Sequence, residues 1–195
     1  MNADLLLNSI SKHIVLNEAE KQLLLSSLQV KKVKKKQHLL LEGDINRFAM
    51  FVTSGCLRSY HLDENGFQYI QQFAPEGWWI ADMYSFITQN AGHLYIDAVF
   101  DSEIILISKV TLEKLYLEIP KLNYYFRILS ENSLVTYQTR AMDNARLSAK
   151  DRYEKFCQRY PTLIDIIAQK QVASYIGVTP EFLSKMLKAE SLSKS

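Results

Sequence analysis

The stretch QVASYIGVTPEFLSKMLK, residues 171–188, decides how the C-terminal part of the chain folds. Its apolar residues are spaced as in two short helices that cross at a turn and share one small core: Val172, Ile176, Val178, Leu183 and Met186. Ala173 stands where two crossing helices admit only a small side chain, and Gly177 can take the positive φ that ends the first helix. Thr179 is the expected N-cap of the second helix and Pro180 its first residue. The stretch therefore predicts a helix-turn-helix.

This motif points to DNA binding, since the second helix of a helix-turn-helix enters the major groove and reads bases with its N-terminal residues. We expect the DNA contacts to come from the capping residue and from the exposed face of that helix: Thr179, Glu181, Ser184, Lys185 and Lys188. A glutamate accepts a hydrogen bond from cytosine N4, and a lysine donates to guanine or to a phosphate. The alternative is an ordinary helical hairpin with a solvated polar face.

The charge of the chain is unevenly distributed. The formal net charge is only +2, but residues 1–120 hold 11 Lys+Arg against 14 Asp+Glu, whereas residues 121–195 hold 12 against 7. The part that contains the motif is therefore basic, as a DNA-binding region requires. The run KKVKKK at residues 31–36 could also touch phosphates, but lysines that precede the first expected strand are better explained as a solvated edge that discourages sheet pairing.

The sequence disfavours several classes of protein. The four histidines are scattered without metal-ligand spacing, and neither a GxSxG nor a Walker sequence occurs, so we expect neither an enzyme nor a bound cofactor. Cys56 and Cys157 are too few and too far apart for a thiolate metal site. No stretch is apolar over a length that spans a bilayer, and the start MNADLLLNSI lacks the features of a secretion signal. We therefore expect a cytoplasmic protein with no membrane partner.

Residues 43–108 have glycines at regular intervals that are typical of turns between short strands. Gly43, Gly55, Gly66 and Gly77 recur every eleven or twelve residues, and the runs between and after them are rich in aromatic and β-branched residues. Such spacing, with DENG at residues 63–66 as a hairpin turn, predicts an antiparallel sandwich or barrel. The residues before it, from 3 to 28, have a helical apolar pattern.

A segment without glycine or proline runs from Lys121 to Tyr160, and its apolar residues Ile128, Val135 and Met142 are seven apart. This heptad spacing favours a helix that pairs with the same helix of a second copy, although a helix lying against the barrel can also produce it. The sequence thus predicts a homodimer, which suits the palindromic operators that two-fold symmetric regulators bind.

The order of barrel, long helix and helix-turn-helix resembles that of the Crp/Fnr family of bacterial transcription regulators. The resemblance covers nearly the whole chain and lies in five stretches: LLLEGD at 39–44, FVTSGCLRSY at 51–60, GWWIAD at 77–82, DSEIILIS at 101–108 and VASYIGVTPEFLSKML at 172–187. It implies a jelly roll of the cyclic-nucleotide-binding type that senses a ligand, a helix that forms the dimer interface, and a DNA-binding end. RNA polymerase is a further candidate partner.

Two departures limit what the resemblance implies. Cyclic-AMP-binding members use a Gly-Glu pair and an Arg-Ser pair, where this chain has Ala81-Asp82 and Gly92-His93, so the cation for the phosphate is missing. We therefore expect an effector other than cyclic AMP. The second departure is that only AESLSKS follows the recognition helix, so we expect no β-hairpin wing.

The candidate effector residues follow from the cassette positions and from the part of the long helix that passes the ligand pocket in the family: Trp79, Ala81, Asp82, Gly92, His93, Tyr95, Tyr137 and Arg140. Arg140 could supply the missing cation, although an arginine on a long helix is more often a surface residue. His93 could bind an anion when protonated, or be an ordinary loop histidine. Trp78 and Trp79 are adjacent, so on a strand at most one faces the barrel interior.

The sequence thus predicts an α+β fold with an antiparallel jelly-roll barrel, a long dimerisation helix and a C-terminal helix-turn-helix. The expected domains are residues 1–120 for the N-terminal helices and barrel, 121–147 for the dimerisation helix and 148–195 for DNA binding. The predicted function is transcription regulation by a homodimer that binds palindromic double-stranded DNA and senses an unknown small-molecule effector. The alternative is a sensor or interaction protein that does not bind DNA.

Overall fold

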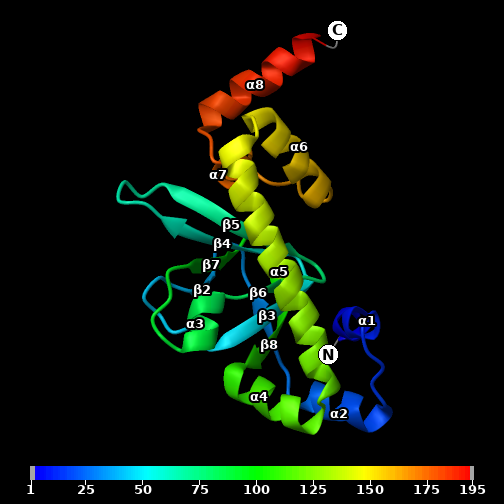
Figure 1. The fold of residues 1–195 in the computed structure, drawn as a ribbon. Coiled ribbons are helices and arrows are strands. Elements are labelled where there is room, and N and C mark those ends of the chain that lie inside the picture. Colours follow the sequence, from blue (N-terminus) through cyan, green and yellow to red (C-terminus); the bar gives the residue numbers. More distant parts are fainter. Residues whose placement is uncertain (1–2, 194–195) are drawn as a thin grey trace. The chain divides into compact units, whose positions relative to one another are not determined.

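The computed structural model describes residues 3–193, and the chain divides into two compact units. The first unit consists of the residues up to His61 together with Gln71–Glu131, and the second consists of Leu62–Ile70 together with the residues from Asn132 onward. Figure 1 labels the helices and strands along the chain.

The strands form two four-stranded sheets, with orders β1-β8-β3-β6 and β2-β7-β4-β5. These sheets belong to the first unit except for Leu62 at the end of β4 and residues 68–70 at the start of β5. The strands are β1 (Gln29–Val33), β2 (His38–Leu40), β3 (Phe48–Ser54), β4 (Cys56–Leu62), β5 (Gln68–Pro75), β6 (Trp79–Ile80), β7 (Tyr95–Ala98) and β8 (Ser102–Ser108). Strand β8 pairs antiparallel with both β1 and β3, and β7 pairs antiparallel with both β2 and β4. The predicted antiparallel jelly roll is confirmed, with its strands in two sheets rather than in one closed barrel.

Apolar side chains from both sheets form one buried cluster. The first sheet contributes Val33, Met50, Val52, Ile80 and Ile104, and the second contributes Leu40, Leu57, Ala74, Ile96 and Ala98. Successive residues of a strand face opposite sides of a sheet, so this alternation leaves the other face of the first sheet to be covered by helices.

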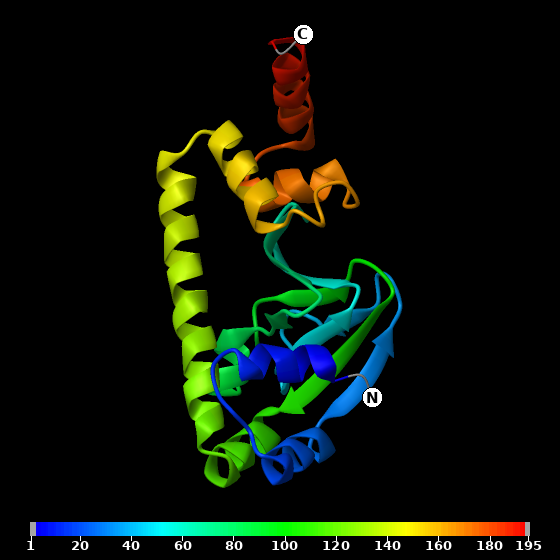
Figure 2. The ribbon, with the colours of Figure 1, turned by 90° about the vertical axis from the view of Figure 1, so that its right-hand side faces the viewer.

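Helices bury that other face. Phe51, Ile105 and Ile107 from β3 and β8 pack there against residues of α1 (Asp4–Ser11), α4 (Lys109–Glu118) and the start of α5 (Lys121–Arg146). Figure 2 shows α1 lying across the sheet. The helix α2 (Glu18–Ser26) is fixed by a capping box, in which the Asn17 side chain accepts from Glu20 N and Glu20 accepts from Asn17 N, each at 2.8 Å.

The second unit contains the turn at residues 63–67 and the C-terminal helices. The Asp63 carboxylate accepts from Asn65 N at 2.9 Å and Phe67 N at 2.8 Å, and Gly66 has φ of 77°, so the sequence DENG forms the predicted turn. After α5 come α6 (Ala149–Arg159), α7 (Gln169–Ile176) and α8 (Pro180–Ser193). The long helix expected over residues 121–147 is present as α5.

Within residues 3–193, no helix combines the length and the apolar character needed to cross a membrane.

Candidate nucleic-acid interface

The helix-turn-helix has the geometry that its sequence predicts. Helix α7 ends at Gly177, whose φ of 72° lies in the left-handed region and whose amide donates to Ala173 O. The next amide, of Val178, also donates to Ala173 O, at 3.0 Å. Helix α8 begins at Pro180, and Thr179 Oγ1 accepts from Phe182 N at 3.2 Å. The predicted cap, first residue and turn glycine are therefore confirmed, and they fix the start of α8.

A small core holds α7 and α8 together. Val172, Ala173 and Ile176 from α7 and Leu183 from α8 are each at most 2% exposed. Behind them, the rings of Phe156, Tyr160 and Tyr175 meet with centroids 5.1 to 5.5 Å apart. Burial strongly raises the pKa of the Tyr160 phenol, so the hydroxyl of Tyr160 remains protonated. This core holds the start of α8 against α7.

Most of the predicted DNA-contacting residues lie on the side of α8 that faces away from this core. Glu181, Lys185 and Lys188 are exposed on α8, as is the capping Thr179, while Ser184 is half-buried. The sequence interpretation missed Phe182, a phenylalanine that is 52% exposed beside Glu181. Its position outside the apolar set of Leu183 and Met186 was the signal that could have found it. Contact of these residues with DNA stays a prediction.

Arg140, which was expected near an effector, binds main-chain groups of the second unit. One of its guanidinium nitrogens, Nη2, donates to Ile70 O at 2.8 Å and to Tyr175 O at 2.7 Å, and the guanidinium carbon lies 3.8 Å from the centre of the Tyr175 ring. Ser174 Oγ accepts from Ile70 N at 3.0 Å and donates to Gln68 O. Arg140 and Ser174 thus tie residues 68–70 to α7. No sequence pattern predicts these contacts, because the partners are far apart along the chain.

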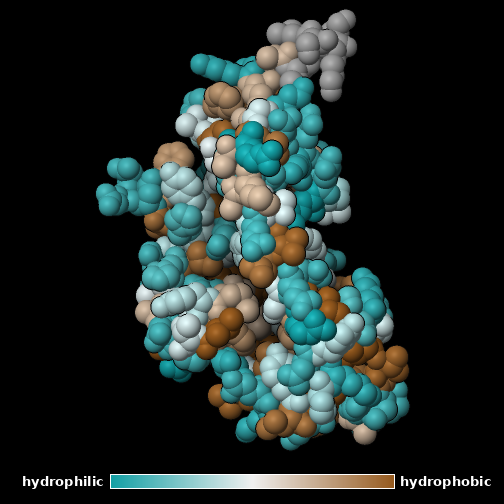
Figure 3. Space-filling model, in the orientation of Figure 1, coloured by the Kyte–Doolittle hydropathy of each residue, from teal (hydrophilic) through white to brown (hydrophobic). Residues whose placement is uncertain are grey.

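Helix α5 differs along its length. Leu122 and Tyr125, near its start, are fully buried among the apolar residues of the first unit. Further along, Leu134, Val135 and Met142 are 54 to 60% exposed, and Figure 3 shows apolar side chains interleaved with hydrophilic ones in this region. Ile128 is half-buried. The start of α5 therefore packs within the first unit, and pairing of the exposed part with a second copy stays a prediction.

The cassette positions of the first unit are occupied by a structural network. Asp82, 2% exposed, caps α3 (Met83–Thr88) by accepting from Ser85 N at 3.1 Å, and its other oxygen accepts from His93 N at 3.0 Å and Leu94 N at 3.1 Å. A Cβ atom at Gly92 would meet that same oxygen at 2.6 Å. Position 92, where the resemblance places the family's arginine, therefore lies directly against a carboxylate.

The remaining effector candidates have separate surroundings. Trp79 packs on the helix-covered side of the first sheet, between Phe51 at 5.2 Å and Phe126 at 5.3 Å, and donates to Tyr125 Oη at 3.1 Å, whereas Trp78 packs on the cluster between the sheets. The two tryptophans thus face opposite ways, as expected.

Of the others, Ala81 is buried, His93 is exposed with its ring 5.3 Å from that of Tyr84, and Tyr137 is half-buried on α5. Tyr95 stacks on Tyr60 at 5.2 Å. Tyr137 and Arg140 belong to the second unit and the other candidates to the first. An effector role for these residues stays a prediction.

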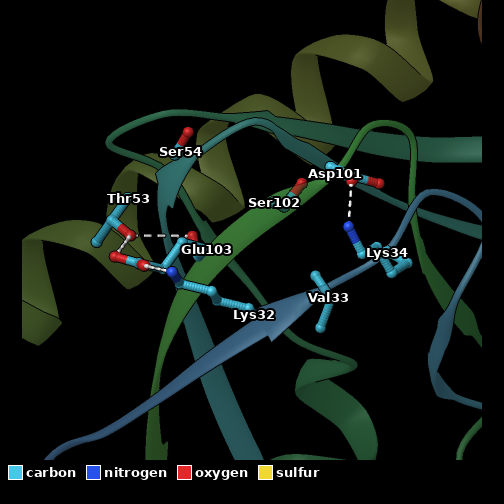
Figure 4. A pocket seen from close by; sticks show the side chains of 8 residues that line it. All are labelled: Lys32, Val33, Lys34, Thr53, Ser54, Asp101, Ser102 and Glu103. Carbon is cyan, nitrogen blue, oxygen red and sulfur yellow. Dashed lines mark hydrogen bonds and ion pairs between the residues drawn. The ribbon is translucent and has the colours of Figure 1, made fainter.

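A polar hollow of about 420 Å³ lies at the ends of β1, β3 and β8 and contains none of these candidates (Figure 4). Its charges pair with one another, since Lys34 Nζ lies 2.8 Å from Asp101 and Lys32 Nζ 4.0 Å from Glu103. The described residues contain no group of histidine, cysteine and acidic side chains placed to hold a metal ion. Burial raises the pKa of the Cys56 thiol to about 12, which keeps it protonated.

No protein-family model matches the chain, and no curated protein matches it. Solved structures do. CLP, a c-di-GMP-responsive global regulator of Xanthomonas campestris, matches with a TM-score of 0.74 at 14% identity over 91% of this chain and 93% of its own. FixK2 from Bradyrhizobium japonicum matches with 0.73 at 17% identity over 86% of each chain. A regulator of the Crp/Fnr family from Eubacterium rectale matches with 0.70 at 19% identity over 91% of this chain and 85% of its own. These likenesses show the fold of the chain.

Proposed function

We propose that this chain, which has the fold of the Crp/Fnr regulators, is a homodimeric DNA-binding transcription regulator. The observation that carries the proposal is the start of α8, where Glu181, Lys185 and Lys188 are exposed on a capped helix of a packed helix-turn-helix. A helix presented in this way fits the major groove, where a carboxylate and ammonium groups meet base edges and phosphates. The basic charge of residues 121–195 supports the same partner.

The second copy of the chain would meet the exposed apolar side chains of α5. Val135 and Met142, seven residues apart, are more than half exposed, as is Leu134 beside Val135. Apolar side chains at heptad spacing lose contact with water when two helices pair. A two-fold dimer places two recognition helices on one duplex, which matches a palindromic site.

The effector would act by shifting the population of arrangements of the two recognition helices, of which only one fits successive major grooves. The contacts of Arg140 and Ser174 with residues 68–70 would hold α7 in one of these arrangements. The effector is not cyclic AMP in this proposal, because Asp82 fills the place where a phosphate-binding arginine would stand. A regulator that activates would contact RNA polymerase as well.

Two variants test the roles of the α8 side chains, with binding to duplexes selected from a random pool measured by mobility shift. Glu181→Ala should relax base preference at one position by about 1 to 3 kcal/mol, because a base-reading contact is lost. Lys188→Ala should weaken binding to all sequences alike and lower the salt slope by about one, because a phosphate contact is lost.

The loss of affinity should therefore depend on the base at one position in Glu181→Ala and be the same for all sequences in Lys188→Ala. An equal loss on every sequence from Glu181→Ala would remove its base-reading role. If the wild-type chain shifted no duplex, the rival function would be favoured, in which the helix-turn-helix serves as a contact for another protein.

A further inference from the structure

Phe182 is an apolar side chain on the polar side of the proposed recognition helix, where it is 52% exposed. A single exposed apolar residue is ordinary on a protein surface, so its exposure alone carries little. Its place is less ordinary, because it lies in the first turn of α8 between the exposed Glu181 and the buried Leu183.

Helix geometry places Phe182 at the border of the proposed reading face. Successive residues turn about 100° around the axis, so Lys185, three residues on, lies about 60° from Phe182, whereas the buried Leu183 lies about 100° away on the other side. Ala189, seven residues on, lies on nearly the same line and is exposed as well. One flank of the face that carries Glu181 and Lys185 is therefore apolar, and Ser184 lies on the opposite flank.

The main chain at Phe182 is held in place. Its amide donates to Thr179 Oγ1 at 3.2 Å, and Leu183 N donates to Thr179 O at 3.1 Å. Leu183 itself is fully buried in the core of the helix-turn-helix. The ring therefore projects from a fixed point, and a contact that it makes is specific in position.

We propose that Phe182 is a specificity-determining residue that packs on the C5-methyl group of one thymine in each half-site. This inference rests on the proposed DNA-binding function. The C5-methyl of thymine is the apolar group that the base pairs present in the major groove, and a phenylalanine side chain is one of its natural partners. Glu181 and Lys185 beside it supply the polar contacts, so the ring adds discrimination of thymine from cytosine, which has no methyl group.

The experiment replaces thymines by deoxyuridines in a duplex that the full chain has selected from a random pool. Deoxyuridine keeps the pairing edge and removes only the C5-methyl. Burial of one methyl group is worth about 0.8 kcal/mol, which is about fourfold in affinity. We expect wild type to lose about fourfold at one thymine per half-site, and about 15-fold when both half-sites are changed.

The variant Phe182→Ala should bind the thymine and deoxyuridine duplexes alike, because the ring that contacts the methyl group is gone. Phe67→Ala is the matched control, since Phe67 is an equally exposed phenylalanine, 49%, outside α8. It should keep the full sensitivity to deoxyuridine. A general loss of stability would weaken both duplexes equally and leave this ratio unchanged.

Binding of the wild-type chain without sensitivity at any thymine, or the same sensitivity in Phe182→Ala, would overturn the inference and leave the proposed function standing. Failure to select any duplex would overturn both.

Discussion

At the scale of single residues, Gly92 leaves no room for a side chain, because a Cβ atom there would meet an oxygen of Asp82 at 2.6 Å. The sequence has glycine at position 92, where the resemblance places an arginine, and it therefore predicts an effector other than cyclic AMP. It did not predict that Asp82 occupies the neighbouring space, because that contact depends on the turn that brings residues 82 and 92 together. With three amides on its two oxygens, Asp82 holds this turn closed.

Restoring the family's arginine should therefore fail. Gly92→Arg places a Cβ atom 2.6 Å from the Asp82 oxygen and 3.0 Å from Ser85 Cβ, so the turn must open and the hydrogen bonds to Asp82 are strained. We expect a loss of about 2 to 4 kcal/mol in the free energy of unfolding, measured with urea, and no binding of cyclic AMP by calorimetry.

Ala91→Arg is the control, since Ala91 is exposed and should accept the side chain at little cost. Micromolar binding of cyclic AMP by Gly92→Arg, with unchanged stability, would show that the pocket is open at this position.

The sequence predicts the turn between α7 and α8 but not the contacts between residues that are far apart along the chain. Gly177, Thr179 and Pro180 act within one turn, so the sequence alone predicted their roles. Arg140 contacts Ile70, which is 70 positions earlier in the chain, and Tyr175, which is 35 positions later. No periodicity of the sequence predicts these contacts. The sequence therefore offers Arg140 only as a candidate cation for an effector or as a surface residue, and its effector role stays a prediction.

At the scale of elements, α5 carries two different apolar surfaces. The heptad spacing predicted a helix with an apolar stripe, and it left open whether a second helix or the barrel covers that stripe. The structure shows Leu122 and Tyr125 buried, whereas Val135 and Met142 are exposed within the chain. A periodic pattern identifies which face of a helix is apolar, but it does not identify what covers that face. The sequence alone therefore could not distinguish the buried part of α5 from the exposed part.

A charge in the exposed part should break the proposed dimer without unfolding the chain. Val135 is 60% exposed, so Val135→Asp costs the isolated chain little, but it would bury an unpaired carboxylate between two helices. We expect the dimer to weaken by several kcal/mol, measured by sedimentation equilibrium, with an unchanged circular dichroism spectrum.

Asn144→Asp adds the same charge nine residues on, on the opposite side of α5, where the side chain is exposed. It should leave association unchanged. If Val135→Asp sedimented as the wild type does, the two copies would meet elsewhere.

At the scale of the whole molecule, the fold and the charge distribution both support the proposed binding of DNA. The jelly roll and the long helix were predictable because turn residues and apolar periodicity repeat along the chain. The division into compact units was not, since residues 62–70 group with the C-terminal helices through hydrogen bonds that no pattern reveals. The excess of basic residues lies in the part with the helix-turn-helix, where phosphates would be neutralised.

In the proposed complex, two copies of this chain place two α8 helices in successive major grooves of one duplex. The most direct test is sedimentation of the chain with a labelled duplex selected from a random pool, together with the sequence of that duplex. We expect two chains per duplex and two inverted half-sites whose centres lie roughly 10 base pairs apart. One chain per duplex, half-sites without inverted symmetry, or no complex at physiological salt would contradict it.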